Sequence, residues 1–357
     1  MFTRLFAWTL LFGSLNAFAS PVVDTYVANA HARYALALNG AVEIQKAVDA
    51  FLSDPTDETL HAARIAWTEA RKPYTETEIY RFYGSPIDNE SEGPEGLINA
   101  WPLDESYIDY VEGVPTSGFI QNPAGFPALT AEVLRDLNEK DGEDNISTGY
   151  HAIEFMLWGQ DLYADSAGRR PVTDFTTAPF ADRRRQYLQT LVDMLVGDLA
   201  WVTAQWAPNR PGNWADRMRQ DPRALTQIFT GLVMLTGSEL SGERMYVALE
   251  SRGQEDEHSC FSDTTHLDIL HDFLGIKNAL VEDGLLELIR AADAAVAGEI
   301  DDALLIAERA LRDILAPFDQ AIVIDAGRVK VLYAIESLEN LAEAIRQGGF
   351  TVGAEVH

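Results

Sequence analysis

The chain has 357 residues, of which 56 are acidic and 27 basic, giving a formal net charge of −29. A surface of this sign repels the phosphates of nucleic acids and anionic lipid headgroups, so no nucleic acid partner is expected. Hydrophobic residues make up 47% of the sequence, enough for two compact domains with a core each. Cys260 is the single cysteine, so the fold depends on packing and not on internal disulfides.

Residues 1–19 are predicted to be a signal peptide. Arg4 supplies the positive start, residues 5–15 an apolar core, and Ala17-Phe18-Ala19 a cleavage signal before Ser20. No later stretch is apolar enough to cross a bilayer, so no transmembrane segment is expected in the mature chain. The sequence predicts an exported, periplasmic protein and leaves open whether it associates peripherally with a membrane.

The first half of the mature chain shows helical periodicity interrupted by one long irregular stretch. Residues 22–53 and 57–82 are predicted to be two long antiparallel helices joined by the short turn around Pro55. Residues 84–126 are rich in Gly, Pro and scattered aromatics, which indicates an ordered excursion with short helical turns. A helix near 127–140 and a short apolar helix over 147–159 follow.

Residues 161–180 form a second polar connection and the predicted domain boundary. Beyond it, helices are predicted over 181–205, 221–250, 266–297 and 301–347, with Pro317 breaking the last. No segment shows the alternation of a strand. The sequence therefore predicts an all-α protein with two packed helical-bundle domains, residues 20–180 and 181–357, in a tandem arrangement like four-helix bundles.

The most distinctive stretch is the apolar helix over 147–159. Its two polar side chains, His151 and Glu154, are three residues apart and share one helical face. Each is costly to bury without a partner. One interpretation is a metal-binding or proton-handling site; the other is a buried His–Glu hydrogen bond that only orients helices. The residue types alone leave both open.

Two other predicted helices carry ionisable side chains at steps of three and four residues. In the first, an arginine seven residues before a glutamate could hold that carboxylate ionised. In the second, two glutamates four residues apart destabilise the helix slightly unless a cation or an arginine lies between them. These groups are Arg71, Tyr74 and Glu78 in the first helix, and Glu239, Glu243 and Arg244 in the second.

Residues 254–268 form the densest polar cluster, with five carboxylates and two histidines in fifteen residues. Such a run is normally a solvated loop, but Cys260 and Phe261 at its centre indicate that part of it folds inward. Asp268 and His271 fit a surface pair. The sequence has no H-E-x-x-H zinc helix, no G-x-S-x-G elbow and no phosphate-binding glycine loop. Imidazole and carboxylate without thiolate suit iron, manganese or zinc, and catalytic zinc needs three protein ligands.

Several of these stretches together resemble the imelysin-like family, known for insulin-cleaving peptidases and for iron-regulated exported proteins. The resemblance covers nearly the whole mature chain in order. Its motifs are Trp67-x-x-Ala70-Arg71-x-x-Tyr74-x-x-Thr77-Glu78, Trp101-Pro102-Leu103 with Ile108-Asp109, G-x-H-x-x-E at Gly149, His151 and Glu154, Gly242-Glu243-Arg244-Met245, and residues 254–266.

The resemblance implies two helical bundles whose shared cleft is lined by the G-x-H-x-x-E helix and the acidic segment, and a role in iron acquisition or metal handling. The leading hypothesis is an exported protein that binds a divalent or ferric metal ion, iron or zinc, and acts with iron-uptake components. Its expected metal ligands are His151, Glu154, Glu78, Glu239 and Glu243, and its expected cleft or supporting residues are Arg71, Tyr74, Arg244, Asp256, His258, Ser262 and Asp263.

Two alternatives stay open. The first is a zinc-dependent imelysin-type metallopeptidase, in which a carboxylate, with Glu154 as the catalytic candidate, activates a bound water. The second is a cleft that binds an organic ligand or a partner protein without metal, with the His–Glu pair as its hydrogen-bonded floor.

Overall fold

The computed structural model describes residues 6–356 of the chain, and the side chains of residues 21–356. This part is all-α and contains no strand, as the sequence predicts. Among these residues, no helix combines the length and the apolar character needed to span a bilayer. The predicted signal peptide lies outside the residues whose side chains are described.

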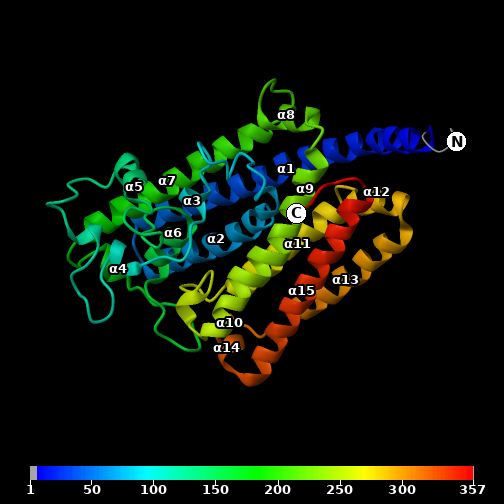
Figure 1. The fold of residues 1–357 in the computed structure, drawn as a ribbon. Helices are drawn as coiled ribbons and strands as arrows, with labels where there is room; N and C mark the ends of the chain where they lie inside the picture. Colours follow the sequence, from blue (N-terminus) through cyan, green and yellow to red (C-terminus); the bar gives the residue numbers. More distant parts are fainter. Residues whose placement is uncertain (1–5, 357) are drawn as a thin grey trace.

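Helices α1 (Phe6–Ser53), α2 (Asp57–Thr75) and α7 (Ala181–Trp206) form the first group, in which α1 packs against both others (Figure 1). Thr56 begins α2 with a capping box, in which its hydroxyl accepts from the Thr59 amide. The short α6 (Gly149–Trp158) packs against α2 and α7. The predicted boundary at residue 181 assigns α7 to the second domain, although α7 packs mainly on α1 and α6; the two-domain division stays a prediction.

The excursion between α2 and α6 is ordered and carries only short helical turns. These are η1 (Glu78–Tyr80), α3 (Glu95–Ile98), α4 (Glu105–Ile108), η2 (Phe119–Gln121) and α5 (Ala131–Leu137). Its turn α3 contacts both α6 and α7, so the excursion folds back onto the first helix group. A further short turn, η3 (Val172–Phe175), precedes α7.

The second group lies beside the first and is built around α15, which packs against α13 and η4 (Figure 1). Helix α11 contacts α2 of the first group as well as α12 and α13 of the second, so it joins the two groups. The elements of this half are α8 (Trp214–Gln220), α9 (Ala224–Met234), η4 (Leu235–Tyr246), α10 (Val247–Ser251), η5 (Gln254–Asp256), α11 (Thr265–Val281), α12 (Leu285–Ala292), α13 (Ala294–Arg312), α14 (Phe318–Val323) and α15 (Asp325–Thr351).

Two helices depart from the sequence prediction in ways that shape the site. The second helix ends at Thr75 and not near Phe82. The backbone amides of Thr77, Tyr80 and Arg81 bond three residues back, so η1 follows as a tighter turn. The predicted helix over 221–250 is continuous, but its middle, η4, is wound as a π-helix. π-Helical segments are rare overall, and those that occur are often found at functional sites.

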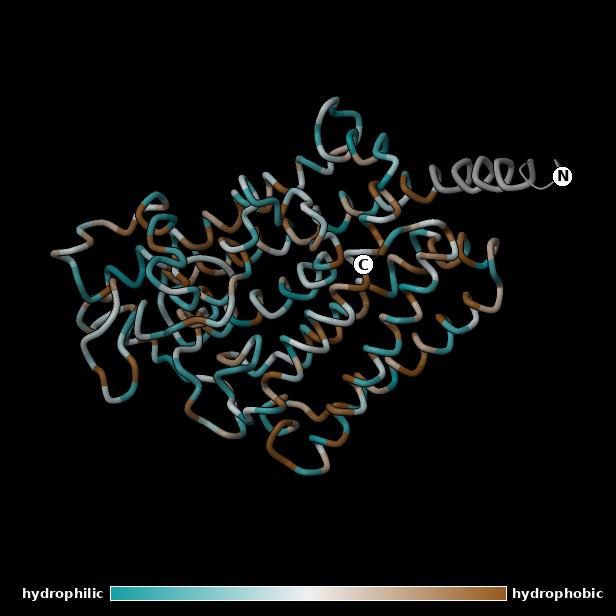
Figure 2. The backbone as a smooth tube through the Cα atoms, in the orientation of Figure 1, coloured by the Kyte–Doolittle hydropathy of each residue, from teal (hydrophilic) through white to brown (hydrophobic). Residues whose placement is uncertain are grey.

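Buried apolar side chains form one continuous cluster that runs through both helix groups. In Figure 2 the helices show apolar residues interspersed with hydrophilic ones. Tyr26, Tyr34, Tyr80 and Trp206 form an aromatic cluster near the middle of α1, with ring centroids 5.1 to 6.5 Å apart. This core fixes α1, η1 and α7 relative to one another and so fixes the start of the excursion.

Candidate functional site

The G-x-H-x-x-E helix α6 begins at a glycine that no other residue replaces easily. Gly149 has a φ of +87°, and a Cβ atom on it would lie 2.5 Å from the carbonyl oxygen of Ile98 in α3. The close approach of α3 and α6 therefore requires a glycine at this position. It also sets the direction in which the helix carries His151 and Glu154.

His151 and Glu154 form a buried pair, with exposed fractions of 1% and 0%. The His151 Nδ1 atom lies 3.0 Å from Glu154 Oε2. Glu154 Oε1 accepts hydrogen bonds from the Ser262 amide at 2.9 Å and the Ser262 hydroxyl at 2.7 Å. Both oxygens of Glu154 are therefore engaged. This carboxylate links α6 to residues 257–264, the polar stretch between η5 and α11.

The protonation of this pair follows from its burial. Burial raises the pKa of Glu154 to about 8, against the opposing hydrogen bonds from Ser262. Burial and the neighbouring His258 hold the pKa of His151 well below its usual value. At neutral pH the imidazole is neutral and one proton is shared between the two side chains. The His151 Nε2 atom is buried and has no hydrogen-bond partner among the described residues.

Asp268 is the centre of a second buried network. It accepts from Arg71 at 2.9 and 3.3 Å, from the Ser259 hydroxyl at 2.6 Å, and lies 2.9 Å from His258 Nδ1. Burial raises the pKa of Asp268, but Arg71 and His258 outweigh it and hold that pKa well below its usual value. The surface pair of Asp268 with His271, which the sequence allowed, does not form.

The two side chains take separate partners for a simple geometric reason. Positions 268 and 271 share the same helix, α11, but Asp268 faces α2 whereas His271 turns to Glu76, whose carboxylate lies 2.9 Å from its Nδ1 atom. Arg71 also donates to the Asn99 side-chain oxygen at 2.5 Å and lies over the ring of Tyr74 at 5.4 Å. Tyr74 thus packs against this network.

A third network centres on Arg244 in η4. Its guanidinium donates to Glu78 at 2.6 Å, to Asp272 at 2.7 Å and to Glu239 at 3.0 Å. Because a π-helix pairs residues five apart, Glu239 and Arg244 meet on one face of η4. Arg81 also binds Glu78, at 2.6 Å. The pairing of Arg71 with Glu78, which the sequence left possible, does not form, since α2 ends before Glu78 and turns it toward η4.

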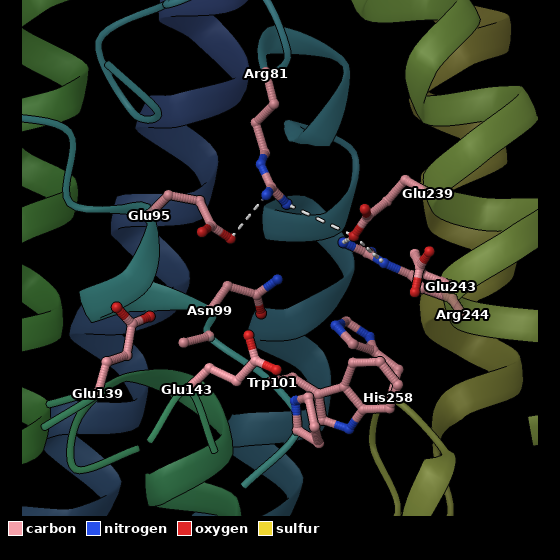
Figure 3. Close-up of a pocket in the computed structure, with 12 residues that line it drawn as sticks. Arg81, Glu95, Asn99, Trp101, Glu139, Glu143, Glu239, Glu243, Arg244 and His258 are labelled. Atoms are coloured by element: carbon pink, nitrogen blue, oxygen red, sulfur yellow. Dashed lines mark hydrogen bonds and ion pairs between the residues drawn. The ribbon is translucent and has the colours of Figure 1, made fainter. Parts of the chain in front are cut away.

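A pocket of about 410 Å³ opens between the excursion and η4. Figure 3 shows Glu95, Glu139 and Glu143 on one side of it and Glu239 and Glu243 on the other. Its lining residues are Arg81, Glu95, Asn99, Ala100, Trp101, Pro102, Glu139, Glu143, Glu239, Glu243, Arg244 and His258. We call it the charged pocket.

His258 connects the charged pocket to the buried pair. Its ring centroid lies 5.6 Å from that of Trp101 and 4.7 Å from that of His151, edge to face in both cases. Burial, together with the positive charge of Arg244, lowers the pKa of His258 to about 4, so its imidazole is neutral at physiological pH. The His258 ring therefore lies between the pocket wall and His151.

The five predicted metal ligands do not come together. His151 and Glu154 lie in the buried pair, Glu78 is held by two arginines, and Glu239 and Glu243 line the charged pocket. Throughout the described part of the chain, no three His, Cys, Asp or Glu side chains are grouped so that they could hold a metal ion. With both oxygens of Glu154 engaged, that residue orients His151 and is not free as a second ligand. These residues therefore do not fit a resident metal with three protein ligands.

The structure also places the remaining predicted residues and shows functional residues that the sequence analysis did not identify. Asp256 lines a second pocket of about 290 Å³, which shares Trp101 and Pro102 with the charged pocket. Ser262 binds Glu154, and Asp263 lies at the junction of the helix groups described below. The sequence reasoning missed Asp268, Asp272, Asn99, Arg81, Glu95, Glu139 and Glu143. The apolar Trp101-Pro102-Leu103 inside a polar excursion was the signal that could have led to several of them.

Fold and site together define an all-α protein in which a charged pocket stands over a buried His–Glu pair. The family model for imelysin matches residues 30–345, and the chain belongs to the imelysin family. Iron-regulated protein A of Synechococcus elongatus is 23% identical over 316 residues, covering 86% of this chain and 79% of that protein.

Two solved structures have the same fold. The structure of a candidate iron-regulated protein A precursor from Parabacteroides distasonis has a TM-score of 0.73 at 17% identity, covering 93% of this chain and 94% of that one. An imelysin-like protein from Psychrobacter arcticum has a TM-score of 0.70 at 16% identity, covering 95% of this chain and 98% of that one.

Proposed function

We propose that this protein is an exported, iron-linked member of the imelysin family that binds iron as cargo in the charged pocket, not in a resident metal centre. The observation that carries the proposal is the state of the pocket's glutamates. Glu139, Glu143 and Glu243 are exposed, line the pocket and make no ion pair with a described residue. The name of the Synechococcus relative supports the link to iron.

The charge balance of the pocket favours a cation. Its arginines, Arg81 and Arg244, are each held by at least two carboxylates, so neither is free to attract an anion. Five glutamates face the pocket. Carboxylates that do not converge on one point suit a hydrated divalent ion, because hydrogen bonds to its water shell need no fixed ligand distance.

In this proposal the buried pair supports the pocket and does not hold the ion. Glu154 holds Ser262, and Asp268 holds His258, so the polar stretch is fixed beneath the pocket. His258 presents a neutral ring beside Trp101 at the pocket wall. Arg71 fixes Asn99, which lines the same wall.

Calorimetric titration with iron(II) under anaerobic conditions tests this function. We expect wild type to bind iron(II), and the triple variant Glu139→Gln, Glu143→Gln, Glu243→Gln to bind at least tenfold more weakly, since each exposed carboxylate contributes on the order of 1 kcal/mol. The matched control replaces Glu299, Glu336 and Glu339, which are exposed glutamates of α13 and α15 outside the pocket. Equal affinities for the two triple variants would refute the pocket as the site.

The same titration separates the alternatives. His151→Ala is expected to keep the wild-type iron affinity within about twofold. Loss of iron binding in this variant would instead indicate that the buried pair is the iron site. If the wild-type protein binds neither iron(II), zinc nor manganese(II), both metal hypotheses are excluded and the organic ligand or partner protein remains. Peptide hydrolysis that needs zinc and is abolished by Glu154→Gln, with the fold intact, would favour the metallopeptidase.

A further inference from the structure

Four carboxylates from three separate segments gather where the two helix groups join. Asp161 lies in the loop after α6, Glu257 and Asp263 lie in the polar stretch between η5 and α11, and Asp319 lies in α14. Both carboxylate oxygens of Glu257 and one of Asp263 are buried and have no hydrogen-bond partner among the residues that the structure describes. We call these four residues the acid seam. They lie outside the three networks that surround the charged pocket.

The acid seam lies within a set of contacts that fasten the loop after α6 to the second helix group. The Gln254 side-chain amide donates to Asp161, and the Gln320 side-chain amide donates to the carbonyl oxygen of Ala164. The Gly168 amide donates to the carbonyl oxygen of Phe261 at 2.9 Å. The segment 160–168 is thus held against the polar stretch, which also carries His258 and Ser262.

Four like charges in a partly dry junction need either a cation or protons. Since no three carboxylates of the described residues are grouped as a metal site, protons are the compensation that this geometry supports. The Asp161 and Asp263 carboxyls are neighbours, so that one proton can be shared between them. Burial, reinforced by Asp161 and Asp319, raises the pKa of Asp263 from 3.8 to about 7, and burial raises the pKa of Asp161 to about 6.

We propose that Asp161 and Asp263 form a proton-shared clasp that fastens segment 160–168 to the polar stretch and loosens when the shared proton is lost. With the proton present, the carboxyl O–H of one residue donates to a carboxylate oxygen of the other. When the proton leaves to solvent, two adjacent carboxylates remain and repel each other, and Asp319 and Glu257 add to the repulsion.

The other charged groups around the clasp do not replace this response. Arg169 opposes it, since its positive charge lowers the pKa of Asp161, but it is exposed to solvent. Asp165 is exposed and adds negative charge. Burial lowers the pKa of His266, so its ring is neutral at neutral pH. The titratable and charged groups facing the clasp are thus Asp165, Arg169, Glu257, His266 and Asp319.

Hydrogen exchange of the full-length protein, measured between pH 5.5 and 8.5 and corrected for intrinsic exchange, tests the clasp. For wild type we expect protection in segments 160–168 and 254–264 to fall on the order of tenfold. A pKa near 7 against an ordinary value near 3.9 permits about 30-fold, and partial solvent exposure reduces it. Asp263→Asn should keep its low-pH protection at pH 8.5, because the amide donates to Asp161 at every pH.

Asparagine is suited to this position, since residue 263 has a φ of +58° and asparagine tolerates that backbone region well. Asp161→Asn gives a second test from the opposite side of the seam, and thermal unfolding at pH 5.5 establishes that each variant is folded. Glu255→Gln, which changes an exposed carboxylate of the neighbouring η5, is the control and should behave as wild type. Wild-type protection that does not change with pH, or variants that lose protection as wild type does, would overturn the clasp.

Discussion

Replacement of Arg244 by methionine removes the cation that joins η1, η4 and α11. The arginine side chain is 1% exposed and binds Glu78, Asp272 and Glu239. Burial raises the pKa of Glu78, but Arg81 and Arg244 outweigh it and bring that pKa to about 2. In Arg244→Met, Glu78 keeps Arg81, whereas the buried Asp272, whose pKa burial already raises well above its usual value, loses the ion-pair partner that it has among the described residues.

The expected magnitude follows from the uncompensated charge. Removing one partner from a buried ion pair costs about 3–5 kcal/mol. Unfolding entropy of roughly 2.1 cal/mol/K per residue gives about 0.7 kcal/mol/K for a chain of this size, so Tm should fall by about 4–7 °C. The methionine fills much of the arginine volume, so loss of packing adds little to this change.

Thermal unfolding followed by calorimetry at pH 7 provides the assay. Arg223→Met, in which an exposed arginine leaves its surface pair with Asp221, should leave Tm unchanged. The double variant Arg244→Met, Asp272→Asn should recover part of the loss, because the unpaired carboxylate is gone. A Tm of Arg244→Met within about 1 °C of wild type, or a double variant no more stable than the single one, would refute this reasoning.

Two further predictions concern the G-x-H-x-x-E helix. The raised pKa of Glu154 means that the native state holds a proton that the unfolded chain has released. The free energy of unfolding should therefore fall by up to about 1.4 kcal/mol per pH unit between pH 6 and 8. Glu154→Gln should flatten this decline in denaturant titrations. The lowered pKa of His151 acts on the other side, reducing stability as pH falls below about 6.5. Gly149→Ala should cost about 2–4 kcal/mol by chemical denaturation, from the positive φ and the clash with Ile98; a cost below about 1 kcal/mol would contradict the close approach of α3 and α6.

The sequence contained enough to predict the helices and the His–Glu pair. Periodicity reports which face of a helix is apolar, and His151 and Glu154 share a face in any α-helix, so their hydrogen bond needed no tertiary information. The same local reasoning failed where the backbone changed its pitch. The end of α2 at Thr75 and the π-helical winding of η4 redirect Glu78 and Glu239, and no periodic pattern records either change.

Contacts between residues that are distant in sequence were the larger part of what the sequence could not predict. Asp268 binds an arginine 197 residues away, and the Glu154 carboxylate is bound by a serine 108 residues further along the chain. Nothing local distinguishes such a carboxylate from a solvated one. Its helical neighbour His271 was an equally good partner by spacing alone. Glu139 and Glu143 escaped attention for the opposite reason, because exposed glutamates in a polar loop are ordinary until a pocket is known to open beside them.

Each buried network joins segments that no continuous helix connects: α2 with α11 through Arg71, η1 with η4 and α11 through Arg244, and α6 with the polar stretch through Glu154. Well-packed apolar residues would hold these segments together at least as firmly, because burying a charge costs several kcal/mol even when it is paired. An apolar contact, however, tolerates sliding, whereas hydrogen-bonded ions accept only a narrow range of positions. Since all three networks adjoin the charged pocket or its floor, fixed geometry at the pocket is what they contribute. Variants that replace a whole network by apolar residues should therefore keep the fold while the pocket wall becomes more mobile, which hydrogen exchange would detect.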